Sequence, residues 1–176
     1  MRWIALALLC AAGLFVGCEK KSSTPTAQMP GQPAQHVFPT SAQSKLQTIR
    51  LWMGSEELET ELALTPIQSE TGMMFRTNMP ENTAMLFVFP RPFRASFWMK
   101  NTILPLSAAY IDPDGIIQEI HDLQPQDTNA VTAGSNNILY VLEVNQGWFQ
   151  RHHIATGTLI RSEYGSLHET FTKRRP

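Results

Sequence analysis

Short apolar segments separated by turn residues recur between residues 45 and 165, and this pattern limits the folds open to the chain. Within residues 58–64, leucine and threonine alternate with glutamate and alanine, a period of two that is typical of a half-buried strand. The apolar segment before it, residues 46–53, is followed by a turn at Gly54-Ser55, so the two segments predict a hairpin. Further runs of this kind lie at residues 85–89, 96–99, 106–111, 116–120, 138–144 and 158–161.

Such runs, at a spacing of roughly ten residues, predict a mainly β (β-rich α+β) fold. We expect a small barrel or sandwich of short, mostly antiparallel strands with one or two short helices. One helix is predicted from Pro66 to Met73, because Thr65 is a good N-cap and Gln68 can complete a capping box. A helical turn is expected at residues 147–153.

Other turn and loop signals divide the remaining segments. Pro90 and Pro92 are expected to end the strand that begins at Met85, because proline cannot donate a ladder hydrogen bond. The sequence at residues 112–115, Asp-Pro-Asp-Gly, predicts a tight turn between two strands. The polar stretch at residues 122–137 is expected to be a loop.

The first segment of the chain carries a targeting signal. Residues 4–16 form an uncharged apolar run after Met1-Arg2, and the run is shorter than the roughly 20 residues that a helix needs to span a bilayer. The tetrapeptide Phe15-Val16-Gly17-Cys18 resembles the processing box of bacterial lipoprotein precursors. This resemblance implies cleavage before Cys18 and lipid attachment to that cysteine. An ordinary cleaved signal peptide with an incidental cysteine is the alternative.

These features predict four regions. Residues 1–17 are a signal peptide, and residues 18–44 are the lipidated cysteine followed by a disordered tether rich in Ser, Thr, Gln and Pro. A β-rich domain covers residues 45–165, and a flexible tail covers residues 166–176.

Cysteine content excludes thiol chemistry from the mature protein. Cys10 and Cys18 are the two cysteines of the chain. Cleavage removes Cys10 and lipidation occupies Cys18, so no thiol remains for nucleophilic catalysis or redox reactions.

The charge balance gives no sign of a nucleic-acid partner. The chain has 14 Lys+Arg against 15 Asp+Glu, a formal net charge of -1, so no global field attracts a polyanion. The expected partners are the membrane, through the lipid anchor, and an unidentified small molecule or envelope protein.

No metal site or cofactor is predicted. The five histidines are dispersed, and the adjacent His152 and His153 point in different directions on a regular element. The methionines invite a Cu(I) hypothesis, because thioethers are soft ligands, but methionine more often fills an irregular core, and we favour that interpretation. The methionines concerned are Met73, Met74, Met79, Met85 and Met99.

Several strings in the domain resemble the domain of unknown function 192 family. They lie at residues 70–76, 84–89 and 96–102, the last reading Ser-Phe-Trp-Met-Lys-Asn-Thr. The resemblance implies a small, largely β domain of a type often secreted or lipid-anchored, and it implies no established activity. Two departures from the family pattern are Ala84, where glycine is usual, and Ser107, where aspartate is usual after Pro-Leu.

Polar residues inside apolar strings define a candidate pocket. A buried charge is costly unless it is paired, so Arg76 and Glu143 should find partners, and they are candidates to pair with each other. In the functional interpretation an aromatic wall meets a few donors, whereas in the structural interpretation these are turn residues and a scaffold ion pair. The candidate pocket residues are Arg76, Trp98, Met99, Asn101, Thr102 and Glu143.

The sequence thus predicts a lipid-anchored bacterial envelope protein on the periplasmic side of a membrane. Glu19 after the lipidated cysteine favours the outer membrane over the inner one. The domain is expected to be a non-enzymatic binding or accessory module, and no catalytic residue is assigned. Two alternatives stay open: a small envelope hydrolase that uses His121 or Glu143, and a purely structural protein-interaction domain.

Overall fold

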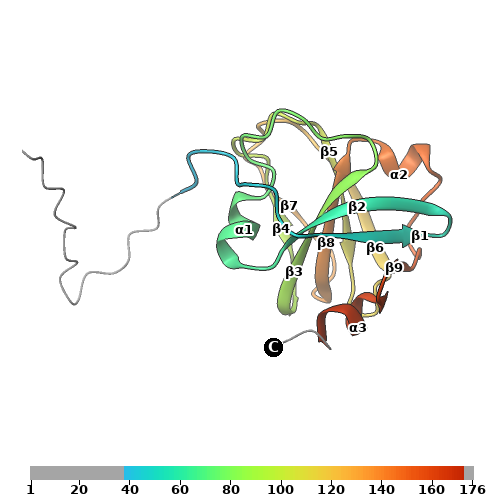
Figure 1. The fold of residues 1–176 in the computed structure, drawn as a ribbon. Helices are drawn as coiled ribbons and strands as arrows, with labels where there is room; N and C mark the ends of the chain where they lie inside the picture. Colours follow the sequence, from blue (N-terminus) through green and yellow to red (C-terminus); the bar gives the residue numbers. More distant parts are fainter. Residues whose placement is uncertain (1–37, 173–176) are drawn as a thin grey trace, which may run out of the picture. The chain divides into compact units, whose positions relative to one another are not determined.

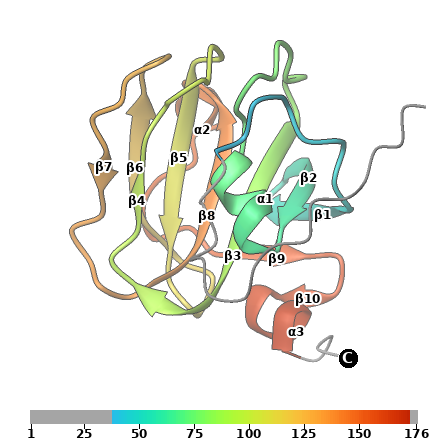
Figure 2. The ribbon, with the colours of Figure 1, turned by 90° about the vertical axis from the view of Figure 1, so that its left-hand side faces the viewer.

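A computed structural model describes residues 38–172 and confirms the prediction of a mainly β fold (Figures 1 and 2). The strands are β1 (Thr48–Met53), β2 (Glu56–Ala63), β3 (Thr83–Phe93), β4 (Ser96–Phe97), β5 (Leu106–Ile111), β6 (Ile117–Leu123), β7 (Val131–Thr132), β8 (Ile138–Asn145), β9 (Ile160–Ser162) and β10 (Gly165–Ser166). The helices are α1 (Pro66–Thr71), α2 (Trp148–Arg151) and α3 (Leu167–Thr172). The predicted signal peptide, the predicted lipidation site at Cys18 and most of the predicted tether lie outside the described residues.

Eight of the strands form one mixed sheet in the order β10-β9-β1-β2-β3-β8-β5-β6, and β4 pairs with β7 in a second, small sheet. The pairing is antiparallel except between β2 and β3. The large sheet is not closed, so the barrel that we allowed for is not formed. An isolated bridge between Ile116 and Leu159 links the β5–β6 turn to the start of β9.

The local signals in the first half of the domain act as predicted. β1 and β2 form the expected hairpin, with Leu51 opposite Leu58. The capping box of α1 is present, because Thr65 Oγ1 accepts a hydrogen bond from the Gln68 amide while Gln68 Oε1 accepts one from the Thr65 amide. Helix α1 is the crossover that a parallel pair requires, so β2, α1 and β3 form a βαβ unit.

The prediction that Pro90 and Pro92 end the third strand is wrong, because β3 continues to Phe93. The pairing of β3 with β8 is interrupted between Val88 and Phe93, and its pairing with β2 stops at Phe87. Both prolines are therefore exposed at a stretch where the ladder requires no amide donor.

The loop predicted at residues 122–137 contains strand β7. Its two residues pair with β4, which places Phe97 opposite Val131. The strand expected at residues 96–99 thus ends at Phe97 and pairs with a segment that carries no strand signal of its own. Tertiary contacts, rather than local pattern, determine this small sheet.

The ordered domain extends past both predicted boundaries. Residues 167–172, predicted as part of a flexible tail, form α3, because Leu167 packs fully buried in the core. At the other boundary, Gln43, predicted to lie in the disordered tether, donates Nε2 hydrogen bonds to the carbonyls of Gln68 (3.1 Å) and Gly72 (2.9 Å). The Gln68 carbonyl also accepts the Gly72 amide at the C-cap of α1, so Gln43 ties the segment before β1 to the end of this helix.

The central strands are buried on both faces, so the domain has two cores. All six residues of β5 are buried. The first core, which includes Leu86 and Leu142, is covered by residues of α2 and α3. The second, which includes Phe87 and Tyr110, is covered by the segments that precede and follow β4. Both views place α2 and α3 at opposite ends of the sheet, α2 at the top and α3 at the bottom (Figures 1 and 2).

Within residues 38–172, no helix has the length and apolar composition needed to cross a membrane.

Replacing Leu86 with alanine tests the first core. Leu86 is fully buried in β3, between β2 and β8, so the substitution leaves a cavity. We expect Leu86→Ala to lower the free energy of unfolding by about 2–5 kcal/mol, measured by urea denaturation. Leu159→Ala, which truncates a leucine that is 39% exposed, is the matched control and should cost far less. Equal losses in the two variants would contradict this assignment of the core.

Candidate functional site

Arg76 is paired with Glu61, not with Glu143. Its Nη1 and Nη2 lie 2.6 and 2.7 Å from the two carboxylate oxygens of Glu61, and both side chains are largely buried. Burial alone would raise the pKa of Glu61, but hydrogen bonds from Arg76 and from the Leu46 amide outweigh it and hold this pKa below its usual 4.5. The predicted Arg76–Glu143 pair is therefore wrong, because a nearer carboxylate on β2 takes the guanidinium.

Arg76 also borders a small polar cavity of about 180 Å³. Lys45, Glu59 and Glu61 line the same cavity, and Lys45 Nζ lies 2.8 Å from Glu59 Oε1. The Nε of Arg76 is buried and has no hydrogen-bond partner within the described part of the chain. The cavity is smaller than the roughly 300–1,000 Å³ typical of small-molecule pockets, so its size suits ordered water better than a substrate.

The Trp-Met-Lys-Asn-Thr string forms a loop that is locked to the segment after α1. The carbonyl of Asn101 accepts a hydrogen bond from the Phe75 amide at 2.8 Å, and both residues have positive φ, 57° and 62°. Met99 is buried in the second core, and Thr102 is buried with its amide bonded to the Met99 carbonyl. The family strings at residues 70–76 and 96–102 thus form two loops that are hydrogen-bonded to each other over one face of the sheet.

Trp98 lies at the surface of this loop. It is 40% exposed, and the Lys100 ammonium lies 5.2 Å from its ring centroid and 4.2 Å from that of Phe38. The six candidate pocket residues are thus divided. Arg76 lines the small cavity, whereas Trp98 and Asn101 are exposed and Met99, Thr102 and Glu143 are buried.

Glu143 is a buried carboxyl in the second core. It is 4% exposed, and within residues 38–172 it has no hydrogen bond or ion pair. Burial in these apolar surroundings raises its pKa from the usual 4.5 to about 8, so the side chain is protonated at neutral pH. The strand pairing places it directly between Met85 of β3 and Ala108 of β5.

The residues suggested for a hydrolase share one face of the sheet but do not form a catalytic pair. Ala108 is opposite both Glu143 and His121, so it separates the two candidates. His121 Nε2 is instead 2.9 Å from the carboxylate of Glu119, on its own strand. The Tyr110 ring packs on His121, but its hydroxyl donates to the Val131 carbonyl at 2.7 Å and forms no hydrogen bond with either candidate.

Ser107, one of the departures from the family pattern, links the sheet to α2. Its hydroxyl donates to Asp122 Oδ1 at 2.5 Å and accepts from the Gly147 amide at 2.8 Å. An aspartate at this position would place a second carboxylate against Asp122, so the serine suits this neighbour. Ser107 therefore links two parts of the structure, and within residues 38–172 no histidine is hydrogen-bonded to its hydroxyl as a catalytic serine would require.

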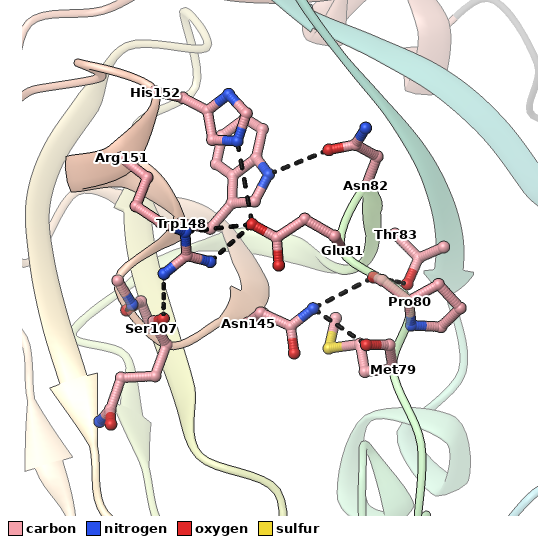
Figure 3. A network of polar contacts seen from close by, with 12 residues as sticks. Met79, Pro80, Glu81, Asn82, Thr83, Ser107, Asn145, Trp148, Arg151 and His152 are labelled. Carbon is pink, nitrogen blue, oxygen red and sulfur yellow. Dashed lines mark hydrogen bonds and ion pairs between the residues drawn. The ribbon is translucent and has the colours of Figure 1, made fainter.

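A polar network continues from α2 to the loop before β3 (Figure 3). Arg151 Nη2 lies 2.6 Å from Glu81 Oε1, and His152 Nε2 is 4.0 Å from the same oxygen. Asn145 donates to the carbonyls of Met79 and Pro80 from the adjoining strand. The network fixes the loop to α2, and these surface charges are engaged with one another.

The methionines occupy core positions, as the core interpretation predicted. All five are buried, and four of them, Met73, Met79, Met85 and Met99, belong to the second core. Among the described residues, no group of three or more His, Cys, Asp or Glu side chains is arranged to hold a metal ion.

A large apolar groove opens beside α3 at the edge of the first core. Its volume is about 1130 Å³, at or above the upper end of the range for small-molecule pockets. The wall residues come from β1, β2, α1, β3, β8, α3, the β5–β6 turn and the segments just before β1 and α1. They are Gln47, Ile49, Leu62, Leu64, Thr65, Pro66, Ser69, Val88, Phe89, Pro90, Pro92, Pro113, Leu139, Tyr140, His168, Thr170, Phe171 and Thr172.

The wall of the groove has almost no charge. It contains no lysine, arginine, aspartate or glutamate, and its one histidine, His168, is exposed on α3. Burial, with a smaller effect of nearby Asp112, raises the pKa of Tyr140 to about 12, so the phenol is neutral at physiological pH. Thr170 and Thr172 hydroxyls already donate to backbone carbonyls. The groove therefore suits apolar matter.

Sequence reasoning did not find this groove. Its residues are distributed from Gln47 to Thr172, and each element contributes only a few of them. The sequence offered one signal, the aromatic residue Phe171 in a segment predicted to be a tail. The structure adds another, because Leu64 and the neighbouring Ile67 are apolar residues that remain 47% and 57% exposed. Such residues often mark a binding surface, but only the fold shows that Leu64 and Phe171 line one groove.

Fold and groove together define a small, mainly β domain with an open mixed sheet and an apolar cleft. The profile of the DUF192 family, described as "Uncharacterized ACR", matches residues 49–162, so the chain belongs to this family. The resemblance noted in the sequence is thereby confirmed. No curated protein matches the chain significantly.

Two solved structures are similar to this protein along nearly their whole length. One is the protein from Sinorhizobium meliloti 1021 named as a "putative transcription regulator", with 32% identity, a TM-score of 0.64, and coverage of 69% of this chain and 98% of that one. The other is a protein of unknown function from Novosphingobium aromaticivorans DSM 12444, with 31% identity, a TM-score of 0.64, and coverage of 80% and 99%. They support the fold and establish no activity for it.

Replacing Glu143 with glutamine should change how stability depends on pH. The carboxyl titrates near 4.5 when unfolded and near 8 when folded, so its contribution is fully present below about pH 4.5 and is lost as the pH rises through about 8. We therefore expect the melting temperature of Glu143→Gln to fall less than that of the wild type between these two pH values.

The matched control for this measurement is Glu57→Gln, which neutralises an exposed glutamate on β2. This variant should follow the pH profile of the wild type. Parallel profiles for Glu143→Gln and the wild type would show that Glu143 does not titrate in this range.

Proposed function

We propose that this protein is a lipid-anchored bacterial envelope protein whose domain binds an apolar ligand in the groove beside α3, without catalysing a reaction. The observation that carries the proposal is the groove itself, with its volume of about 1130 Å³ and its nearly uncharged wall. Exposed apolar surface of this extent is unfavourable in water, and a bound apolar molecule would remove it from solvent.

Anchoring is supported by the sequence preceding the domain. An uncharged apolar run at residues 4–16 leads into the tetrapeptide that ends at Cys18. A single acyl chain holds a protein only weakly, whereas the multiple chains of a bacterial lipoprotein would keep it at the membrane. A domain held there would meet amphiphilic molecules at high local concentration. We place it on the periplasmic side.

The residues that line the groove favour binding over hydrolysis as the function. Glu143 and His121, the residues on which the hydrolase alternative depends, do not line it. The groove wall also lacks a carboxylate that could act with His168 as an acid–base pair. The structural alternative, in which another protein covers the groove, would require an apolar protein segment as the occupant.

Filling the groove should abolish ligand binding. Val88 lies half-buried on β3 and contributes to the wall, so tryptophan in its place would occupy the cleft. We expect wild-type protein to increase the fluorescence of N-phenylnaphthylamine, an uncharged apolar probe, and Val88→Trp to lose most of this increase. The measurement uses the mature chain with Cys18→Ala, so that detergent is not needed.

Val131→Trp provides the matched control, because Val131 is also a half-buried strand valine but lies on β7, outside the groove. This variant should bind the probe as the wild type does. Unchanged binding in Val88→Trp, with a cooperative melting transition retained, would contradict the proposed function.

The anchor is tested separately. Cys18→Ala removes the proposed acylation site, so we expect the protein to move from the membrane fraction to the soluble fraction and to lose incorporation of radiolabelled palmitate. Cys10→Ala, which changes a cysteine inside the proposed signal peptide, should leave both properties intact. Labelling that persists in Cys18→Ala would place the anchor elsewhere or exclude it.

A further inference from the structure

We propose that a surface around Trp98 docks the domain onto the lipid–water interface of the bilayer that holds its anchor. This Trp98 surface consists of Phe38, Trp98, Lys100 and Ile103. None of the four residues lines the apolar groove, so the inference gives the domain a second binding surface. It rests on the proposed function in one respect, since it presumes that the domain is held at a membrane.

The Trp98 surface exposes large apolar side chains. Phe38, Trp98 and Ile103 are 48%, 40% and 49% exposed. Trp98 and Ile103 flank a tight turn, in which the Thr102 amide donates a hydrogen bond to the Met99 carbonyl at 3.0 Å. Exposed apolar side chains that gather in one place often mark a contact with a partner or with a membrane.

Lys100 links Phe38 to Trp98. Its ammonium lies 4.2 Å from the ring centroid of Phe38 and 5.2 Å from that of Trp98, so one cation contacts two rings from distant parts of the sequence. Tryptophan is enriched at the level of lipid headgroups, and lysine can lay its apolar stem on a membrane while its ammonium stays in water. The side chains of the Trp98 surface are therefore suited to a lipid–water interface.

The position of the proposed anchor selects the bilayer as the occupant. The described part of the chain begins at Phe38, so the Trp98 surface lies where the N-terminal segment joins the fold. Phe38 follows Cys18 by 20 residues, which span at most about 70 Å whatever their conformation. An acyl group on Cys18 would keep the Trp98 surface near the bilayer. Docking would then be an intramolecular step, for which a weak affinity is sufficient.

The charges at the Trp98 surface offset each other. Lys100 contributes a cation, and Asp127 borders the same loop, because its carbonyl accepts the Met99 amide at 2.7 Å. The Asp127 carboxylate accepts hydrogen bonds from the amide and the side chain of Asn129. Docking therefore depends on removing the rings and Ile103 from water rather than on attraction to anionic lipid, so salt should affect it little.

The test attaches the protein to vesicles without relying on acylation in the cell. The chain from residue 18 onward has a single thiol, at Cys18, which reacts with a maleimide-bearing lipid in phosphatidylcholine vesicles. Vesicles with brominated acyl chains quench those tryptophans that reach the hydrocarbon. We expect them to quench the wild-type fluorescence at low and at high salt, because Trp98 inserts among the lipids.

Two variants locate the contact. Trp98→Phe should lose most of the quenching, because the remaining tryptophans of this chain, Trp52 and Trp148, lie outside the Trp98 surface. Ile103→Asn keeps Trp98 and should reduce the quenching several-fold. The matched control is Trp52→Phe, which changes a half-buried tryptophan on β1 with the Arg50 cation 5.5 Å from its ring centroid. This control should be quenched as the wild type is, and cooperative melting checks that each variant is folded.

The outcomes separate docking from the proposed function. Wild-type fluorescence that brominated vesicles leave unchanged, or quenching that persists in Trp98→Phe, overturns the docking surface. A dimer that Ile103→Asn dissociates, together with unquenched wild-type fluorescence, assigns the surface to a second copy of the chain instead. Binding of N-phenylnaphthylamine should be equal in Ile103→Asn and the wild type. The groove and the palmitate-labelled anchor are therefore tested independently of docking.

Discussion

Burial of the central strands on both faces is the constraint on which the rest of this structure depends. Strands β3, β8 and β5 lie inside the sheet, and every residue of β5 is buried, so each face must be covered by other parts of the chain. One face is closed by loops that carry the family strings. The other is covered partly by α2 and α3, at opposite ends of the strands (Figure 1), and the apolar groove lies beside α3.

The family strings serve mainly to close the second core. The hydrogen bond between Phe75 and Asn101 joins two loops through residues with positive φ, and Met99 fills the space beneath them. Arg76 is held by Glu61 in the same region. The family strings therefore reflect the contacts that hold this face of the domain together. The groove lies on the opposite face and is lined by other residues.

Much of the fold could be predicted from the sequence, because its signals are local. The β1–β2 hairpin and the capping box at Thr65 follow from alternation and from short-range hydrogen bonding. The predictions were wrong where contacts between residues far apart in the sequence determine the secondary structure. The proline-containing end of β3 and strand β7 depend on which neighbours pair, and α3 depends on burial of Leu167. The groove could not be predicted for the same reason, because residues far apart in the sequence form it.

Methyl NMR during a titration with N-phenylnaphthylamine tests most directly whether apolar matter binds in the groove. In protein with labelled leucine and valine methyl groups, we expect chemical-shift changes at Leu62, Val88 and Leu139, which line the groove. The methyl groups of Leu123 and Val131, on the opposite face, should not shift. Saturating ligand that leaves the first set unmoved, or that shifts only the second, would contradict the account.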